Sequence, residues 1–159
     1  MKIIKADLDN PEHQRDILAL TLAYARDAMG SGASLPEDVQ RNLVRGLRAM
    51  PTVHIFLAYM DEQPVGIATC FLGFSTFNAR PLLNIHDFAV LPEYRKRGIG
   101  RLLLEDVMEK ARALGCCKLT LEVVEQNHRA KRIYEAAGFT PALGGVEKGQ
   151  TLFYTKNIS

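Results

Sequence analysis

The pattern of apolar and polar positions divides the chain into segments with two different periods. Where apolar residues recur every third or fourth position, the pattern predicts a helix with one buried face, and where they alternate or form short runs it predicts a strand. The predicted helices span 10–29, 35–50, 98–114 and 127–137. The predicted strands span 2–6, 52–60, 65–74, 80–91, 118–124, 139–143 and 152–156. The elements therefore follow one another as β-α-α-β-β-β-α-β-α-β-β.

Residues at the segment ends support several of these bounds. Asn10 followed by Pro11 is typical of a helix cap and a first helical position. Ser34 is a candidate cap for the second helix, after a glycine- and serine-containing break. Gly115 and Gly138 follow the third and fourth helices and are typical stop residues.

The order of elements predicts an α/β protein of the α+β type, with one mixed central sheet of about seven strands. The short turn at 61–64 makes the strands on either side of it an antiparallel hairpin. Strand 80–91, helix 98–114 and strand 118–124 form a strand–helix–strand unit, whose strands we expect to be parallel with a right-handed crossover. Because no linker or repeat interrupts the 159 residues, we expect a single domain over 1–159.

The composition argues against several classes of function. Twenty Lys and Arg against eighteen Asp and Glu give a formal charge of +2, which is not typical of proteins that coat nucleic acid or anionic membranes. No apolar run approaches the roughly 20 residues that span a bilayer, and the first residues lack the core of a signal peptide. Three cysteines and four scattered histidines favour neither a disulfide framework nor a zinc site. We therefore expect a cytoplasmic protein without a metal.

The densest chemistry lies between Val90 and Arg101, where a strand ends, two glycines follow and a helix begins. The first turn of a helix has unpaired N–H groups and a positive dipole end, and glycine lets a ligand approach the backbone. Such a turn can hold a pyrophosphate, although a tight turn with solvated charges would have the same sequence. Four cations surround it: Arg95, Lys96, Arg97 and Arg101. Neither the Walker loop nor the dinucleotide fingerprint fits, because Arg101-Leu102-Leu103 follows Gly100.

Two sequence blocks resemble those of the GNAT N-acetyltransferase superfamily. Arg95-x-x-Gly98-x-Gly100 is similar to its acetyl-CoA motif Q/R-x-x-G-x-G/A. The block from Asn127 to Phe139 is similar to its pattern N-x-x-A-x-x-x-Y-x-x-x-G-F. The resemblance is specific over 84–139, and before Arg80 only the order of elements agrees. It implies a GNAT-like fold, acetyl-CoA as co-substrate, and direct transfer of an acetyl group to a primary amine of a small molecule or peptide.

The resemblance also implies which residues hold acetyl-CoA. The backbone of the motif strand would pair with the pantetheine arm, the amides of the turn would hold the pyrophosphate, and Asn127 would contact the arm beside Ala130. Asn127 also suits a helix cap. The implied residues are Phe88, Ala89, Val90, Arg95, Lys96, Arg97, Gly98, Ile99, Gly100, Arg101, Asn127, Ala130 and Tyr134.

Three residues are candidates for proton transfer. Tyr134 matches the family tyrosine that protonates the departing thiolate, and a phenol with its ordinary pKa near 10 arrives with its proton; the alternative role is packing. Glu122 is our first candidate for the general base, because Leu121-Glu122-Val123 resembles a site of ribosomal-protein alanine acetyltransferases. His86 is the second, since an imidazole titrates near neutrality. Asp87, or a water relay to one of these groups, stays open.

The sequence says less about the acceptor and about alternative functions than about acetyl-CoA. The resemblance places acceptor entry near 30–37, 66–78 and 144–150, and Asp27 is among the acids that could attract a cationic amine. Family members are often dimers, so a homodimer is compatible with the sequence. Two other functions stay open: a non-catalytic acyl-CoA-binding sensor, and a nucleic-acid-binding protein that uses the basic clusters. The nearly balanced charge and the absence of interleaved aromatic residues weigh against nucleic acid.

Overall fold

The computed structural model describes residues 1–141. They belong to two compact units, one spanning Met1–Asn127 and one that begins at His128. The predicted strand 152–156 and the predicted acceptor loop 144–150 lie outside the described residues, as does the end of the predicted strand 139–143. Residues 139–141 are described and are not part of a strand.

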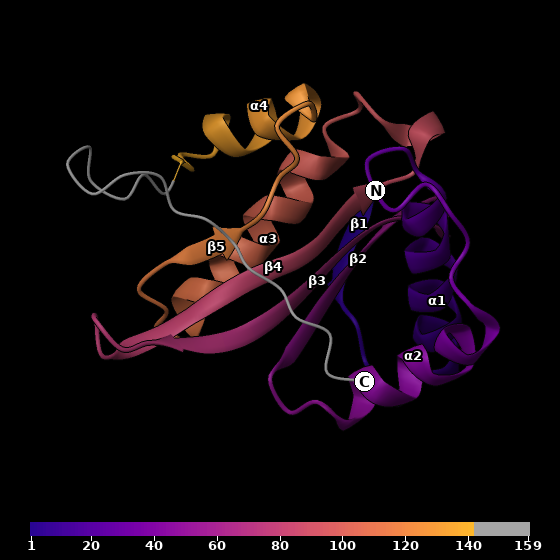
Figure 1. Cartoon of the computed structure of the whole chain (residues 1–159), viewed down its shortest axis with the longest axis horizontal. Helices are drawn as coiled ribbons and strands as arrows, with labels where there is room; N and C mark the ends of the chain where they lie inside the picture. Colours follow the sequence, from indigo (N-terminus) through magenta and orange to yellow (C-terminus); the bar gives the residue numbers. More distant parts are fainter. Residues whose placement is uncertain (142–159) are drawn as a thin grey trace. The chain divides into compact units, whose positions relative to one another are not determined.

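The first unit contains one mixed sheet of five strands, in which sequence order and spatial order coincide (Figure 1). The first three pairings are antiparallel and the last is parallel, which confirms the predicted hairpin and the predicted parallel pair. The predicted total of about seven strands is not confirmed, because the described residues contain five. The strands are β1 (Lys2–Lys5), β2 (Val53–Met60), β3 (Gln63–Ser75), β4 (Arg80–Val90) and β5 (Leu119–Leu121).

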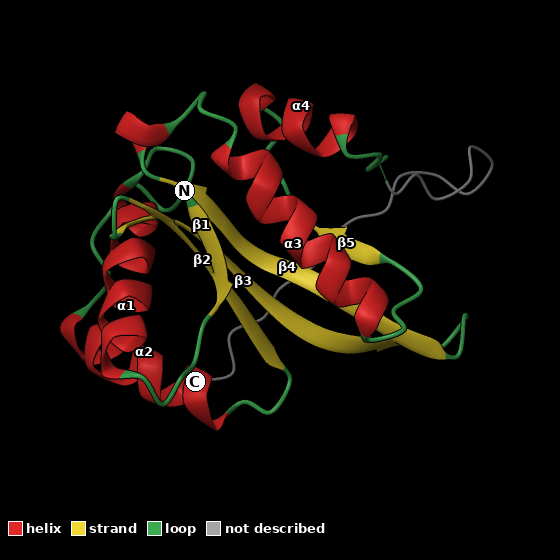
Figure 2. Ribbon diagram, turned by 180° about the vertical axis from the view of Figure 1, so that it is seen from behind, coloured by secondary structure: helices red, strands yellow, loops and turns green. Residues whose placement is uncertain are grey.

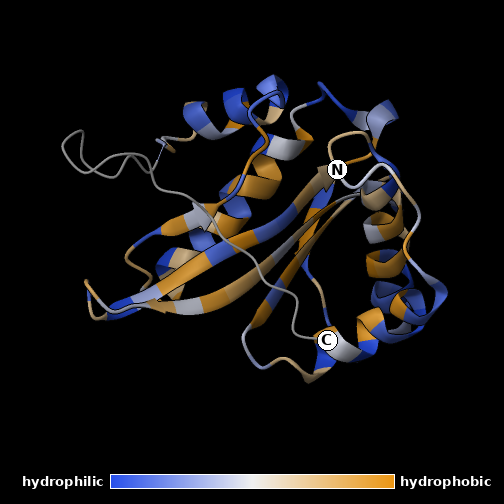
Figure 3. Cartoon of the chain, in the orientation of Figure 1, coloured by the Kyte–Doolittle hydropathy of each residue, from blue (hydrophilic) through white to orange (hydrophobic). Residues whose placement is uncertain are grey.

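Helices cover both faces of this sheet (Figure 2). Side chains alternate along a strand, so Ile55 and Leu57 of β2 lie on one face and Ala58 lies on the other. The first face packs against α1 (Pro11–Arg26) through Ile17, with α2 (Glu37–Ala49) alongside α1. The second packs against α3 (Ile99–Ala113) through Ile99. Figure 3 shows the hydrophobic residues along the strands and on α1 and α3 that these contacts bury.

The helix ends confirm one predicted cap and correct another. The side chain of Asn10 accepts a hydrogen bond from the Glu12 amide at 2.8 Å, so α1 begins as predicted. α2 begins only at Glu37, after Pro36, and has no side-chain cap. The predicted cap Ser34 instead accepts a hydrogen bond from Nε of Arg26 at 3.1 Å. Proline disfavours the helical conformation in the residue before it, so Leu35 is not helical and α2 begins after Pro36.

The second unit is described here by α4 (His128–Ala136) and the residues up to Pro141. Gly138 follows the helix with φ of 90°, and the Phe139 amide donates to the Tyr134 carbonyl at 3.0 Å. The chain thus turns back on the last helical turn, and the Phe139 ring lies 5.8 Å from the Tyr134 ring. The predicted helix and its glycine stop are confirmed, with bounds shorter by one residue at each end. In the described part of the chain, no helix combines the length and apolar character that crossing a membrane requires.

Candidate functional site

β4 and β5 pair over three residues only and then separate. Residues 83–85 of β4 pair with Leu119–Leu121, where β5 ends, whereas β4 continues to Val90. On its other side β4 stays paired with β3 as far as Val90, which lies opposite Gly66. β5 therefore does not extend along residues 86–90 of β4. A strand edge presents backbone donors and acceptors that an extended amide chain can match.

Two candidates for the general base lie at this point of separation. His86 and Glu122 each follow the last paired residues, Ile85 and Leu121, and both side chains are exposed. His86 is also the extra residue of a β-bulge, because Asp87 lies opposite Thr69 while Ile85 lies opposite Cys70. A bulge redirects the side chain that it contains. The pairing of Ile85 with Leu121 therefore places two residues that are far apart in sequence at the same end of the β4–β5 pair.

The position of Glu122 differs from the sequence prediction in one respect. The strand was expected to continue to Val124, which would have placed a carboxylate within a buried parallel strand. Instead β5 ends at Leu121, and residues 122–124 are exposed. The carboxylate of Glu122 is thus open to solvent, and the desolvation cost expected for a buried acid does not arise.

A half-buried carboxyl group, that of Asp87, lies next to the bulge. Burial raises the pKa of Asp87, and the neighbouring His86 lowers it in part. Burial raises the pKa of Tyr24 on α1, and Asp87 raises it further. The pKa of Cys70 on β3 is raised to about 12, mainly by burial and to a smaller extent by Asp87. Burial is thus the main cause of each of these shifts, and the charge of Asp87 adds to the shifts of Tyr24 and Cys70.

Replacing Asp87 by Asn is expected to stabilise the protein at neutral pH. The pKa of the Asp87 carboxyl group is higher in the folded state than in the unfolded state. The protonated carboxyl group therefore contributes stability that is fully present below about pH 3.9, the ordinary pKa of an aspartate. That contribution is lost as the pH rises through the pKa of the folded state. At pH 7.5, Asp87→Asn should raise the melting temperature, because the substitution removes a desolvated charge. Thermal unfolding of both proteins at pH 7.5 and pH 3.5 tests this. A gain of equal size at both pH values would contradict the electrostatic explanation.

The turn after β4 has the backbone geometry of an anion site. A short 3-10 helix (Pro92–Tyr94) leads to Lys96 and Gly98, which have φ of 62° and 78°. Gly98 is the N-cap of α3, and no side chain caps the helix. The space around Gly98 is open, since among the described residues no atom outside its immediate chain neighbours lies within 4 Å of where a Cβ would stand. Left-handed residues before a helix N-terminus turn successive amides toward one point, as in known phosphate sites.

Each of the three arginines at this turn has a partner. Arg95 forms an ion pair with Asp27, and its Nε donates to the Val90 carbonyl at 2.9 Å. The Arg97 guanidinium lies 5.3 Å from the centre of the Tyr94 ring. Arg101 pairs with Glu105 at 2.6 Å, four residues further along α3. The side chain of Arg95 is thus directed toward α1 rather than standing as a solvated charge.

The pair between Asp27 and Arg95 was missed by sequence reasoning, which treated Asp27 as an acid that could attract the acceptor. The two residues are separated by 68 positions, and no local pattern links them. A small pocket lies beside the pair, between the end of α1 and the end of β4. It is lined by Leu20, Ala23, Tyr24, Asp27, Ala89, Val90, Leu91, Pro92 and Arg95.

The remaining predicted residues fall in different places. Phe88 and Ala89 lie on β4 beyond the point where β5 ends, and Asn127 immediately precedes α4. Tyr134 and Ala130 belong to α4 in the second unit, where Tyr134 is buried. Within residues 1–141, no three His, Cys, Asp or Glu side chains gather in a group that could hold a metal ion. A metal-free reaction remains a prediction.

Comparisons with known proteins agree with this geometry. The model of the Acetyltransferase (GNAT) family matches residues 19–139. The chain is 28% identical to the uncharacterized N-acetyltransferase YycN of Bacillus subtilis (strain 168), over 87% of this chain and 93% of that protein. It is 24% identical to a thialysine N-epsilon-acetyltransferase of Caenorhabditis elegans, over 81% of this chain and 78% of that protein.

A solved structure with the same fold is AAC(6')-Iy in complex with the bisubstrate analog CoA-S-monomethyl-acetylneamine. The TM-score is 0.76 at 19% identity, with 99% of this chain and 98% of the other covered. At this identity, the likeness concerns the fold.

Proposed function

The chain belongs to the GNAT acetyltransferase family and is an acyltransferase, and from this premise we propose that it moves the acetyl group of acetyl-CoA directly to a primary amine. The acceptor in this proposal is a small molecule or a peptide. The relative from Caenorhabditis elegans, named for the ε-amine of thialysine, supports an amine acceptor. The CoA conjugate bound to AAC(6')-Iy supports a CoA thioester as donor.

The observation that carries the proposal is the backbone geometry of the turn between β4 and α3, residues 91–98. The left-handed residues Lys96 and Gly98 turn the amides at the N-terminus of α3 toward one point, which suits a pyrophosphate. In this proposal pantetheine lies beside residues 86–90 of β4, a placement supported by the match of this strand to the motif strand of the family.

In the proposed reaction, acetyl-CoA supplies a thioester whose carbonyl carbon the amine attacks. Glu122 or His86, at the point where the strands separate, accepts the proton that the amine loses as the C–N bond forms. Tyr134 donates its proton to the sulfur as the C–S bond breaks, a role supported by its match to the family motif. Holding both reactants in place is itself a large part of the catalysis expected.

Glu122→Gln is expected to lower kcat/KM by about 10²-fold, the usual contribution of a general base. It should also change the acidic limb of the pH–rate profile, because the amide cannot accept a proton. His86→Gln should have the smaller effect. Steady-state rates from pH 5.5 to 9 measure both. Glu125→Gln, a neighbouring exposed acid in the same loop, is the control and should leave the profile unchanged. A normal profile in Glu122→Gln together with a lost limb in His86→Gln would reassign the base.

Calorimetry with acetyl-CoA, CoA and desulfo-CoA tests the proposed function. Saturable binding at micromolar concentration or tighter supports the donor site, and the absence of binding to folded protein would refute it. Thiol release in the presence of polyamines, amino acids, aminoglycosides and peptide N-termini then identifies the acceptor. Each assay needs a blank without amine, because Cys116 and Cys117 are only partly buried. Binding without turnover on any amine would favour the sensor.

A further inference from the structure

We propose that Asp27 is a positioning residue that couples the loop between α1 and α2 to the turn after β4, residues 91–98, which we call the anion-binding turn. Its carboxylate bridges the two segments, so donor binding at the turn and the order of the loop depend on each other. This inference rests on the proposed function, because it assumes that the turn binds CoA.

One carboxylate oxygen of Asp27 contacts the anion-binding turn. Its Oδ2 pairs with the Arg95 guanidinium, which also donates from Nε to the carbonyl of Val90, the last residue of β4, at 2.9 Å. The pair is largely buried, with 12% of the Asp27 side chain and 21% of the Arg95 side chain exposed. Arg95 thus connects the end of β4 to the end of α1, three residues before Gly98.

The other carboxylate oxygen of Asp27 contacts the loop between α1 and α2. The Oδ1 atom of Asp27 accepts a hydrogen bond from the Met29 amide at 2.9 Å. The backbone carbonyl of Asp27 accepts a hydrogen bond from the Gly30 amide at 2.9 Å. The loop then folds back on the last turn of α1, where the Ser31 hydroxyl and the Ala33 amide both donate to the Ala25 carbonyl, at 3.0 and 3.2 Å. The loop is therefore a hydrogen-bonded structure that begins at Asp27.

Gly30 shows how closely this loop packs against α1. A Cβ at position 30 would lie 2.2 Å from the Tyr24 carbonyl oxygen, so only glycine fits. The same loop begins the region where the sequence predicts acceptor entry, 30–37. Asp27 therefore stands between the expected acceptor side and the anion-binding turn, with a separate contact to each.

A competing role for Asp27 predicts the opposite sign. If Asp27 only withheld Arg95 from the phosphates, Asp27→Asn would release the arginine and remove a negative charge near an anion site. Both effects would strengthen the binding of CoA. If Asp27 positions the turn, Asn would deprive Arg95 of its anionic partner and weaken binding, despite the more favourable net charge. The direction of the change thus separates the two roles.

The first measurement is the affinity of CoA for the full chain by calorimetry. Asp27→Asn is expected to weaken binding about tenfold, and Arg95→Gln at least as much, because it also removes the hydrogen bond to Val90. The double variant should weaken binding about as much as Arg95→Gln alone, because both substitutions disrupt the same ion pair. Affinity that is unchanged or strengthened in Asp27→Asn would overturn the inference. If Asp27→Asn does not fold, Arg95→Lys replaces it, since a lysine keeps the charge but cannot bond Asp27 and Val90 together.

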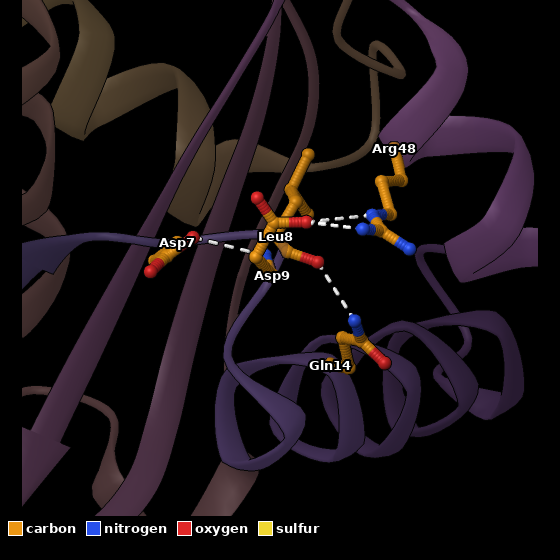
Figure 4. A network of polar contacts seen from close by, with 5 residues as sticks. All are labelled: Asp7, Leu8, Asp9, Gln14 and Arg48. Atoms are coloured by element: carbon orange, nitrogen blue, oxygen red, sulfur yellow. Dashed lines mark hydrogen bonds and ion pairs between the residues drawn. The ribbon is translucent and has the colours of Figure 1, made fainter.

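A second Asp–Arg pair provides the matched control. Asp9, which precedes α1, pairs with Arg48 near the end of α2, with the Asp9 carboxylate 2.5 Å from Nη2 and 2.7 Å from Nε (Figure 4). Its side chains are 72% and 60% exposed, and it lies outside the proposed site. Asp9→Asn and Arg48→Gln should leave the affinity for CoA unchanged.

Hydrogen exchange separates coupling from simple structural support. In the wild type, saturating CoA should slow amide exchange over residues 27–34, and Asp9→Asn should preserve that response. In Asp27→Asn at saturating CoA, the slowing should be lost, whereas a merely structural role would raise exchange in both states and keep the difference. A response that persists in Asp27→Asn refutes the coupling. Absence of CoA binding to the wild type would instead refute the proposed function, and the inference with it.

Discussion

Tyr134→Phe is expected to lower kcat by about 10²-fold or more and to leave the affinity for acetyl-CoA nearly unchanged. The substitution removes the hydroxyl that the proposed mechanism uses to protonate the departing thiolate. The ring remains, so its contact with Phe139, at 5.8 Å between ring centres, is kept. Steady-state kinetics on the identified amine, together with calorimetry on acetyl-CoA, separates turnover from binding.

Tyr59→Phe is the matched control for Tyr134→Phe. The Tyr59 hydroxyl donates to Asp16 at 2.5 Å, between β2 and α1, so its loss should lower the melting temperature without changing kcat. If Tyr134→Phe behaves like this control, with normal turnover, Tyr134 has a packing role and the sulfur receives its proton from another group.

Gly98→Val is expected to weaken acetyl-CoA binding by about two orders of magnitude. Two effects combine at this position. The side chain would occupy the open space beside the N-terminus of α3, and a β-branched residue resists the φ of 78° that orients the amides. Losing one or two hydrogen bonds to a charged phosphate, each worth about 1.5–3 kcal/mol, accounts for an effect of this size. Calorimetry with acetyl-CoA measures it.

Gly115→Val controls for backbone strain in this experiment. Gly115 follows the other end of α3 with φ of 68°, and no atom lies within 4 Å of where its Cβ would stand. Both variants should lose a similar amount of stability, about 1–2 kcal/mol, but only Gly98→Val should lose binding. Normal acetyl-CoA affinity in a folded Gly98→Val protein would rule out the turn as the pyrophosphate site.

Most of the local structure could be predicted from the sequence because its causes are local. The 3.6-residue apolar period decides where α1 and α3 lie, and their buried residues recur at that spacing. The cap at Asn10 and the left-handed glycines at 98, 115 and 138 each follow from the chemistry of one or two residues. The family resemblance depends on such residues too, which is why it could be recognised over 84–139 and is confirmed.

The errors in local prediction had two different causes, a competing local signal and a missing strand partner. Ser34 is a good cap residue, but Pro36 determines the start of α2. The apolar residues Val123 and Val124 resemble a continuing strand, but pairing with β4 ends at Leu121, and both side chains are exposed. A strand persists only where a neighbouring strand satisfies its backbone, and the sequence of one segment does not contain that information.

The sequence by itself determined the order of the elements from β1 to α4, the glycines of the turn and the candidate residues for proton transfer. Only the tertiary structure decided which of these residues meet. The pairing of Ile85 with Leu121 places His86 and Glu122 at the same end of the β4–β5 pair, and the bulge at His86 precedes the half-buried Asp87. Asp27 binds Arg95 across 68 positions because α1 and the end of β4 pack together. Contacts of this kind depend on strand register and helix packing, which a pattern of neighbouring residues does not encode.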